Sequence, residues 1–308
     1  MRKARAPLGG FRNTDILSSG EMTSATISVP KPPPRGHPGG PSAIGGRIYG
    51  IVRDAIFETG DMVVLTGKTL VSAVRPPYPY GIEFVQQFLF ALRLCWFPML
   101  LSTVAFGYEA PGLQAANFLV LFGALDRLGG FFVLASIREF APFVDAVVMA
   151  GVGGTAITAD LGARKIRDEL DALVVMGVDP IKNLVVPRFL ALMLVTGLFD
   201  IYALCFGILG GVLATLVNHA PLGPFFATLL NNAETTDLWA SVVKTTLFGA
   251  IIAIVCCYKG MTASGGAAGV GRAVNQAVVI AFLGIFAFNY AFTQVLLATH
   301  PSITTIAK

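Results

Sequence analysis

Three charged residues lie within one of the longest apolar stretches of this sequence. Arg138, Glu139 and Asp145 all fall inside Phe131–Ala159. One charged side chain at the centre of a membrane helix costs about 2.5–3.5 kcal/mol on insertion scales, so each such residue needs a partner or a function. Arg138 and Asp145 are seven positions apart and share a helix face. Between them, Pro142 leaves the Arg138 carbonyl without its usual amide donor, which predicts a kinked, polar site.

This pattern has a structural and a functional interpretation. The charges could form an internal ion-pair network that holds the helices together, or a polar element beside a cavity for lipid headgroups, with Arg138 facing an anionic group. Asp200 and Lys244 are weaker candidates for the same element. A relay of protons along these residues is typical of ion-driven transporters and is the third possibility.

A second group of charges fills the segment ARKIRDELDALVVMGVDP, Ala163–Pro180. Its apolar residues recur at helical spacing, and opposite charges stand four positions apart, each such pair contributing about 0.2–0.5 kcal/mol. The expected pairs are Arg164/Asp168, Lys165/Glu169 and Arg167/Asp171. Gly177 is a C-cap signal and Pro180 a stop. We therefore predict one compact amphipathic helix over 163–177, outside the membrane, joining two apolar spans.

The composition indicates the elements that position these charges. Of the 308 residues, 55% are hydrophobic and 13% are charged, which is too apolar for an ordinary soluble domain. Five windows reach the roughly 20 apolar residues that cross a bilayer. They are Phe88–Tyr108, Phe131–Ala159, Phe189–Val217, Trp239–Tyr258 and Ala277–Ala298. The predicted fold class is an all-α integral membrane protein with five transmembrane helices, and Ala115–Leu125 is expected to be a short helix or turn outside the core.

The N-terminal part differs in composition from the rest. Residues 1–45 are expected to be a disordered cytoplasmic tail rich in Pro and Gly, and 46–75 an amphipathic helix lying in the membrane interface, or else packed on the bundle from the cytoplasmic side. Lys and Arg concentrate in the N-terminal region and in the Asp160–Arg188 and Lys259–Asn275 loops, whereas Asn218–Leu238 has none. The positive-inside rule then predicts a cytoplasmic N-terminus and an extracytoplasmic C-terminus.

Several short motifs follow one another along the second and third apolar windows. They are R-E-x-x-P from Arg138, A-D-L-G from Ala159, E-L-D-A-L-V-V-M-G-V-D-P from Glu169 and V-P-R from Val186. This order resembles the signature of the MlaE/YrbE permeases, the membrane subunits of ABC transporters that work with Mce-domain proteins. A second stretch, Lys244–Val279, resembles the family's fourth span, its Gly-rich loop and the start of the fifth.

The resemblance implies an MlaE-like permease domain over 84–300 that moves lipid across the cell envelope. The implied cargo is phospholipid, fatty acid, mycolic-type lipid or sterol. ATP and Mg²⁺ would bind an ABC ATPase dimer, so this chain would be no enzyme and hold no cofactor or metal. Other implied partners are a second YrbE permease, an Mce hexamer, lipid and the plasma (inner) membrane, but no nucleic acid. The coupling helix, 163–177, would contact the ATPase through Glu169, Asp171, Leu173, Met176 and, just beyond it, Asp179, while Arg138, Glu139 and Asp145 would lie at the lipid cavity.

One residue departs from the family pattern. Many relatives carry Arg where this chain has Val152, so no role of that arginine is carried over. The loop after the fourth span and the basic tail look most like the actinobacterial YrbE branch, which favours a heterodimer over a homodimer. The alternatives are an ion-coupled secondary transporter and a passive scaffold for ATPase and Mce proteins. The glycine-rich segments lack the spacing of a phosphate-binding loop, and the four cysteines are interpreted as small buried apolar residues.

Overall fold

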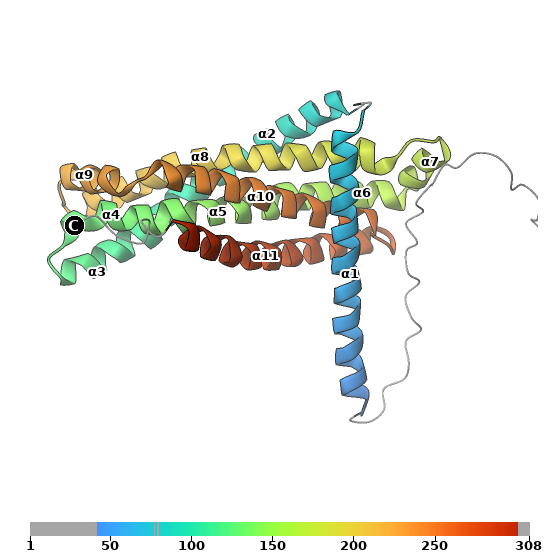
Figure 1. Cartoon of the computed structure of the whole chain (residues 1–308), viewed down its shortest axis with the longest axis horizontal. Coiled ribbons are helices and arrows are strands. Elements are labelled where there is room, and N and C mark those ends of the chain that lie inside the picture. The colour runs from blue at the N-terminus through green and yellow to red at the C-terminus, as the bar shows by residue number, and fades with distance from the viewer. Residues whose placement is uncertain (1–41, 77, 79, 301–308) are drawn as a thin grey trace, which may run out of the picture. The chain divides into compact units, whose positions relative to one another are not determined.

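The computed structural model describes residues 42–76, 78 and 80–300, and this part of the chain is almost entirely helical (Figure 1). The elements in order are α1 Ser42–Val74, α2 Gly81–Gly107, η1 Tyr108–Gln114, α3 Ala115–Leu121, η2 Leu125–Arg127, α4 Leu128–Phe132, η3 Val133–Phe140, α5 Ala141–Val148, η4 Met149–Gly154, α6 Thr155–Ile166, α7 Glu169–Val175, η5 Ile181–Val185, α8 Val186–Val217, α9 Leu222–Asn232, α10 Thr235–Met261 and α11 Gly266–Thr299. The expected tail, 1–45, lies mostly outside the described residues.

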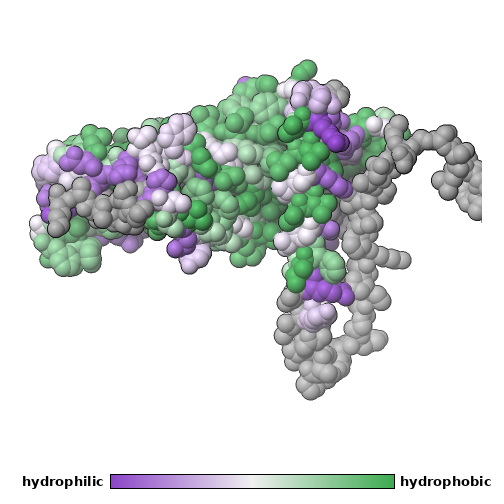
Figure 2. Space-filling model, in the orientation of Figure 1, coloured by the Kyte–Doolittle hydropathy of each residue, from purple (hydrophilic) through white to green (hydrophobic). Residues whose placement is uncertain are grey.

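Five helical segments among the described residues are long and apolar enough to cross a membrane. They are Gly81–Leu121, Leu125–Ile166, Ile181–Val217, Thr235–Met261 and Gly266–Thr299. Each contains one predicted window, so the predicted all-α class with five membrane-spanning helices is confirmed. In Figure 2 hydrophobic residues cover much of the middle of these spans, and hydrophilic residues gather towards their ends and along α1.

The spans pack around α8 and α10, which contact each other and most of the other helices. Two small residues show how close these contacts are. A side-chain carbon added to Gly154 would lie 2.7 Å from Cys256 Sγ, and one added to Gly211 would lie 2.6 Å from the Phe132 ring. Both glycines therefore allow close packing between helices of this chain. One cysteine, Cys205, is exposed on α8, so the interpretation of all four as buried is wrong for that residue.

Wide π-helical turns interrupt the spans at η1, η3, η4 and η5. Such turns are frequent at functional sites because they leave backbone groups imperfectly paired and redirect side chains. In the second span, η3 carries Arg138 and Glu139 and ends just before Pro142. The predicted distortion near Pro142 is therefore present, as a π turn that leads into α5.

The single helix predicted over 163–177 is wrong, because the chain breaks between α6 and α7. Asp168 has a left-handed backbone conformation, with φ of 57°, and it separates Ile166 from Glu169. The break changes every expected ion pair. The observed pairs are Arg164–Asp160, Lys165–Asp171 and Arg167–Glu169. Gly177 does adopt the positive φ, 76°, that the C-cap prediction requires.

The helix α1 runs across the spans (Figure 1). It contacts η5, α8 and α10. Glu58 pairs with Lys259, and the Tyr258 hydroxyl donates to Asp61 at 3.2 Å, so the contact with α10 is polar. Apolar side chains of α1 such as Ile56, Phe57 and Val63 are exposed by about two thirds, which is typical of a helix whose apolar face meets lipid.

Candidate functional site

Arg138 and Glu139 of the second span contact charged side chains of a later helix. Arg138 Nε donates to Asp237 Oδ1 at 2.8 Å, and its Nη2 lies 3.3 Å from Oδ2. Asp237 belongs to the first turn of α10 and its side chain is fully buried. It also accepts the backbone N–H of Glu234 at 3.1 Å, as part of a capping box. One carboxylate thus neutralises Arg138 and closes the start of α10.

Lys244 on α10 satisfies the backbone group that Pro142 leaves without a donor. Its Nζ donates to the Arg138 carbonyl at 2.9 Å and lies 3.4 Å from Glu139 Oε2. Asn289 and Thr293 of α11 donate to the same Glu139 carboxylate, at 3.0 and 2.9 Å. Arg138, Glu139 and Lys244 therefore form one polar cluster that ties the second, fourth and fifth spans together.

Asp145 does not join this cluster, which corrects the expectation that it shares a polar site with Arg138. It is fully buried, and among the described residues neither of its oxygens has a hydrogen-bond partner. The side chain of Asp200 is close enough to interact with it electrostatically. Asp200 is also fully buried and accepts from Ser241 at 3.0 Å through one oxygen. Asp200 also interacts electrostatically with Lys244, so it lies between Asp145 and the polar cluster.

A second polar cluster lies at the end of the bundle that carries α7. Arg188, at the start of α8, is fully buried; its Nη2 lies 2.7 Å from Asp160 Oδ2 of α6 and 3.7 Å from Glu83 Oε1 of α2. About 22 residues separate Arg138 from Asp160 along the second span, and the same number separate Asp237 from Lys259 along α10. That is about 33 Å of helix, close to the thickness of a hydrocarbon core. The two polar clusters are therefore separated by about the thickness of a hydrocarbon core.

The predicted coupling residues lie on and beside α7. Glu169 accepts from Arg167 Nε at 2.7 Å, and this hydrogen bond raises the pKa of Arg167 above its usual value. Asp171 pairs with Lys165, and the Asp179 carboxylate accepts the backbone N–H of Ile181 at 2.9 Å. These three acids stabilise the segment from the end of α6 through α7 to η5, residues 160–188, which we call the α7 hairpin.

The apolar residues of α7 divide between two sides. Leu173 is partly buried against the main hydrophobic core, so only part of its side chain is available for the expected contact. Val174, Val175 and Met176 are exposed by 60, 88 and 67%. The sequence analysis placed Met176 among the expected contact residues but not the two valines, which are exposed as well.

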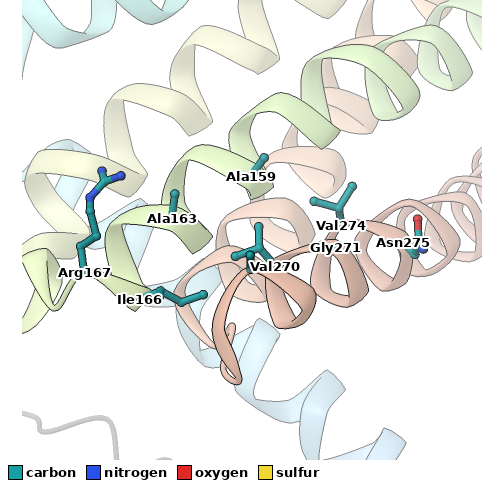
Figure 3. A pocket seen from close by; sticks show the side chains of 9 residues that line it. Ala159, Ala163, Ile166, Arg167, Val270, Gly271, Val274 and Asn275 are labelled. Atoms are coloured by element: carbon teal, nitrogen blue, oxygen red, sulfur yellow. The ribbon is translucent and has the colours of Figure 1, made fainter.

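An open groove of about 650 Å³ lies between α6 and α11 near the α7 end (Figure 3). Its walls are small or aliphatic, with one charged and one amide side chain. The lining residues are Ala159, Ala163, Ile166, Arg167, Ala267, Val270, Gly271, Val274 and Asn275. Gly151, earlier on the second span, is also exposed and has no neighbour within 4 Å of an added side-chain carbon. Small residues on membrane helices permit close approach of another helix.

Comparison with known proteins supports a transporter. Residues 84–295 match the family Permease MlaE. A probable ABC transporter permease of Synechocystis is 37% identical over 180 residues, covering 58% of this chain and 68% of that protein. A probable ABC transporter permease of Rickettsia typhi is 30% identical over 240 residues, covering 78 and 92%. The chloroplastic protein TRIGALACTOSYLDIACYLGLYCEROL 1 of Arabidopsis thaliana is 33% identical over 198 residues, covering 63 and 56%.

Proposed function

Because this chain belongs to the MlaE permease family, we propose that it is the membrane subunit of an ATP-driven transporter that moves lipid across a cell envelope. The energy comes from an ABC ATPase dimer, which binds ATP and Mg²⁺, while the permease carries out no chemistry. One relative has a name containing that of a glycolipid, trigalactosyldiacylglycerol, and this supports a lipid cargo. Phospholipid, fatty acid, mycolic-type lipid and sterol are the cargo classes to be tested.

We propose that the protein lies in the plasma membrane and that the α7 end of the bundle is on the cytoplasmic side. The basic residues of the α6–α8 region support this orientation by the positive-inside rule, whereas the segment that contains α9 has no Lys or Arg. The N-terminus is then cytoplasmic and the C-terminus extracytoplasmic. The helix α1 lies in the cytoplasmic interface, and Arg138 and Glu139 lie at the outer boundary, where a lipid headgroup would be released or taken up.

The exposed tip of α7 carries the proposal. Three consecutive apolar residues, Val174, Val175 and Met176, are exposed beyond the membrane end of the bundle, next to ion pairs that keep the hairpin folded. An exposed apolar patch with a polar rim is typical of a protein interface. We propose that the ATPase binds this tip. Glu169, Asp171 and Asp179 orient the tip, and Leu173 packs α7 against the core.

The groove between α6 and α11 is the proposed contact with a second permease. The fifth span is the least buried of the five, with 11% of its most apolar window inside the structure. The small residues that line the groove would allow a helix of the neighbouring subunit to pack closely against α6 and α11. A heterodimer of two YrbE-type paralogues, as in the actinobacterial branch, and an Mce hexamer on the outer side complete the proposed assembly.

The test is to reconstitute the permease with its ATPase and outer partners in lipid vesicles and to measure lipid transfer. We expect Val175→Arg to lower copurification of the ATPase by about tenfold or more, because interface hot spots are apolar and desolvated. Val217→Arg, at an exposed valine of the opposite end, is the matched control and should leave copurification unchanged. Unchanged copurification in Val175→Arg would contradict the proposed grip. Transfer that follows a proton gradient without ATP would instead favour the ion-coupled alternative.

A further inference from the structure

Arg188 is the largest side chain in the described structure that is completely buried. We propose that Arg188 is a positioning residue that joins the two arms of the α7 hairpin and passes a displacement of α7 to the first span through Glu83. This inference rests on the proposed function, since it assumes that an ATPase moves α7. Arg188 lies at the base of the α7 hairpin. It is 13 residues after Val175 of the exposed tip, which corresponds to about 20 Å of helix.

The first step is the closure of the hairpin. Asp160 and Arg188 are 28 positions apart in the sequence, and the chain between them contains the end of α6, all of α7 and η5. The 2.7 Å contact between Arg188 Nη2 and Asp160 Oδ2 joins α6 to α8 at the base of this excursion. Arg188 Nη1 also donates to the Leu184 carbonyl at 2.8 Å, within the wide turn η5. A force on α7 therefore moves α6 and α8 together and does not spread them apart.

The second step is the link to the first span. Glu83 lies in the first turn of α2, and its Oε1 is 3.7 Å from the same Nη2 that binds Asp160. The same Oε1 accepts from Gln87 at 3.0 Å, which holds the carboxylate along α2. The short contact with Asp160 is thus the fixed one, and the longer contact with Glu83 is the one that a small displacement can strengthen or break. Because α2 packs along α8, this change acts on the whole first span.

The chemistry of the side chain suits this position. A guanidinium group is planar and presents several N–H donors in fixed directions, so one arginine can contact a backbone carbonyl and two carboxylates at once. A lysine ammonium is a point charge without this geometry. Removing one partner of a buried ion pair is costly because it leaves a charge without compensation. Asp160 and Glu83 are partly exposed, with side-chain exposures of 43 and 31%, so water can stabilise them when the contact with Arg188 changes.

The experiment compares Glu83→Gln with Arg164→Gln in the reconstituted complex. Both changes remove a partly exposed charge from the same cluster, but Arg164 binds Asp160 Oδ1, at 3.2 Å, whereas Arg188 binds Oδ2 of the same carboxylate. Copurified ATPase, ATP hydrolysis and lipid moved per ATP are measured. In a Cys205→Ser background, spin labels at Ile82→Cys and Ala172→Cys report the distance between α2 and α7 with and without nucleotide.

We expect Glu83→Gln to retain the ATPase and its hydrolysis, to lower lipid moved per ATP by about fivefold or more, and to lose the nucleotide-dependent change in distance. Arg164→Gln should behave like the parent. Arg188→Met should match Glu83→Gln, and if that variant does not fold, Glu83→Gln alone decides. A parent without any nucleotide-dependent distance change, or a Glu83→Gln variant identical to the parent, overturns the inference. If the change depends on Glu83 but the parent moves no lipid, the inference stands and the proposed function fails.

Discussion

The ion pair between Arg138 and Asp237 makes the strongest stability prediction. Asp237→Asn keeps the size of the side chain but removes the negative charge that faces Arg138 Nε at 2.8 Å. Because the Asp237 side chain is fully buried, water cannot replace the lost interaction. Breaking a buried ion pair from one side costs about 3–5 kcal/mol, and the weakened cap of α10 adds roughly 0.5–1 kcal/mol. Some solvent reaches Arg138, which is 15% exposed, so we expect a loss of about 3 kcal/mol.

The assay is reversible unfolding of the purified permease in detergent, followed by helical circular dichroism in increasing denaturant. Asp145→Asn is the matched control, since it changes another fully buried aspartate of the same bundle. Neither oxygen of Asp145 has a hydrogen-bond partner among the described residues. Burial of an acid without a cation is unfavourable, so Asp145→Asn should leave the free energy of unfolding within about 1 kcal/mol of the parent or raise it. Equal losses in the two variants would refute the assignment of the ion pair.

Two further predictions concern the backbone and the helix contacts. Lys244→Met should destabilise the permease by about 2 kcal/mol, because it leaves the Arg138 carbonyl without this donor and the Glu139 carboxylate without its nearby cation. Adding Pro142→Ala restores an amide donor for the carbonyl and should recover part of the loss in the same unfolding assay. Gly211→Leu should lower the free energy of unfolding by about 1–3 kcal/mol, because the new side chain clashes with the Phe132 ring. Gly151→Leu should leave the free energy of unfolding unchanged, because nothing in the described structure lies near this glycine. It should instead weaken pairing with the second permease, measured by crosslinking in the membrane. The first assignment would be contradicted if the Lys244→Met/Pro142→Ala double variant were no more stable than Lys244→Met. The second would be contradicted if the two leucine variants had the same free energy of unfolding.

The five spans were predictable because each is recognised by the apolar character of one continuous segment. The charged partners were not. Arg138 and Asp145 share a face of an ideal helix, yet Arg138 binds Asp237, which is 99 positions away, and the wide turn η3 changes which residues face each other. The Pro142 argument succeeded for the opposite reason. A missing N–H is a local fact, although the group that replaces it, Lys244, comes from another helix.

The α7 hairpin shows the same limit at shorter range. Charges at four-residue spacing predicted one helix, whereas the left-handed conformation of Asp168 divides it and exchanges the ion pairs. Leu173 then packs against the core and Val175 is exposed. No pattern within the segment distinguishes these two sides, because the core that Leu173 meets is built by other helices.

The amino-acid order alone decides how many segments of this chain are apolar enough to cross a membrane and which loops carry the basic residues, because the free energy of inserting a helix is close to a sum over its own residues. Tertiary packing decides which acid neutralises which base, which glycines have another helix packed against them and which side chains of α7 remain exposed. Those choices depend on side chains from distant segments that meet at a few ångströms, where one neighbour determines whether a buried charge is stable.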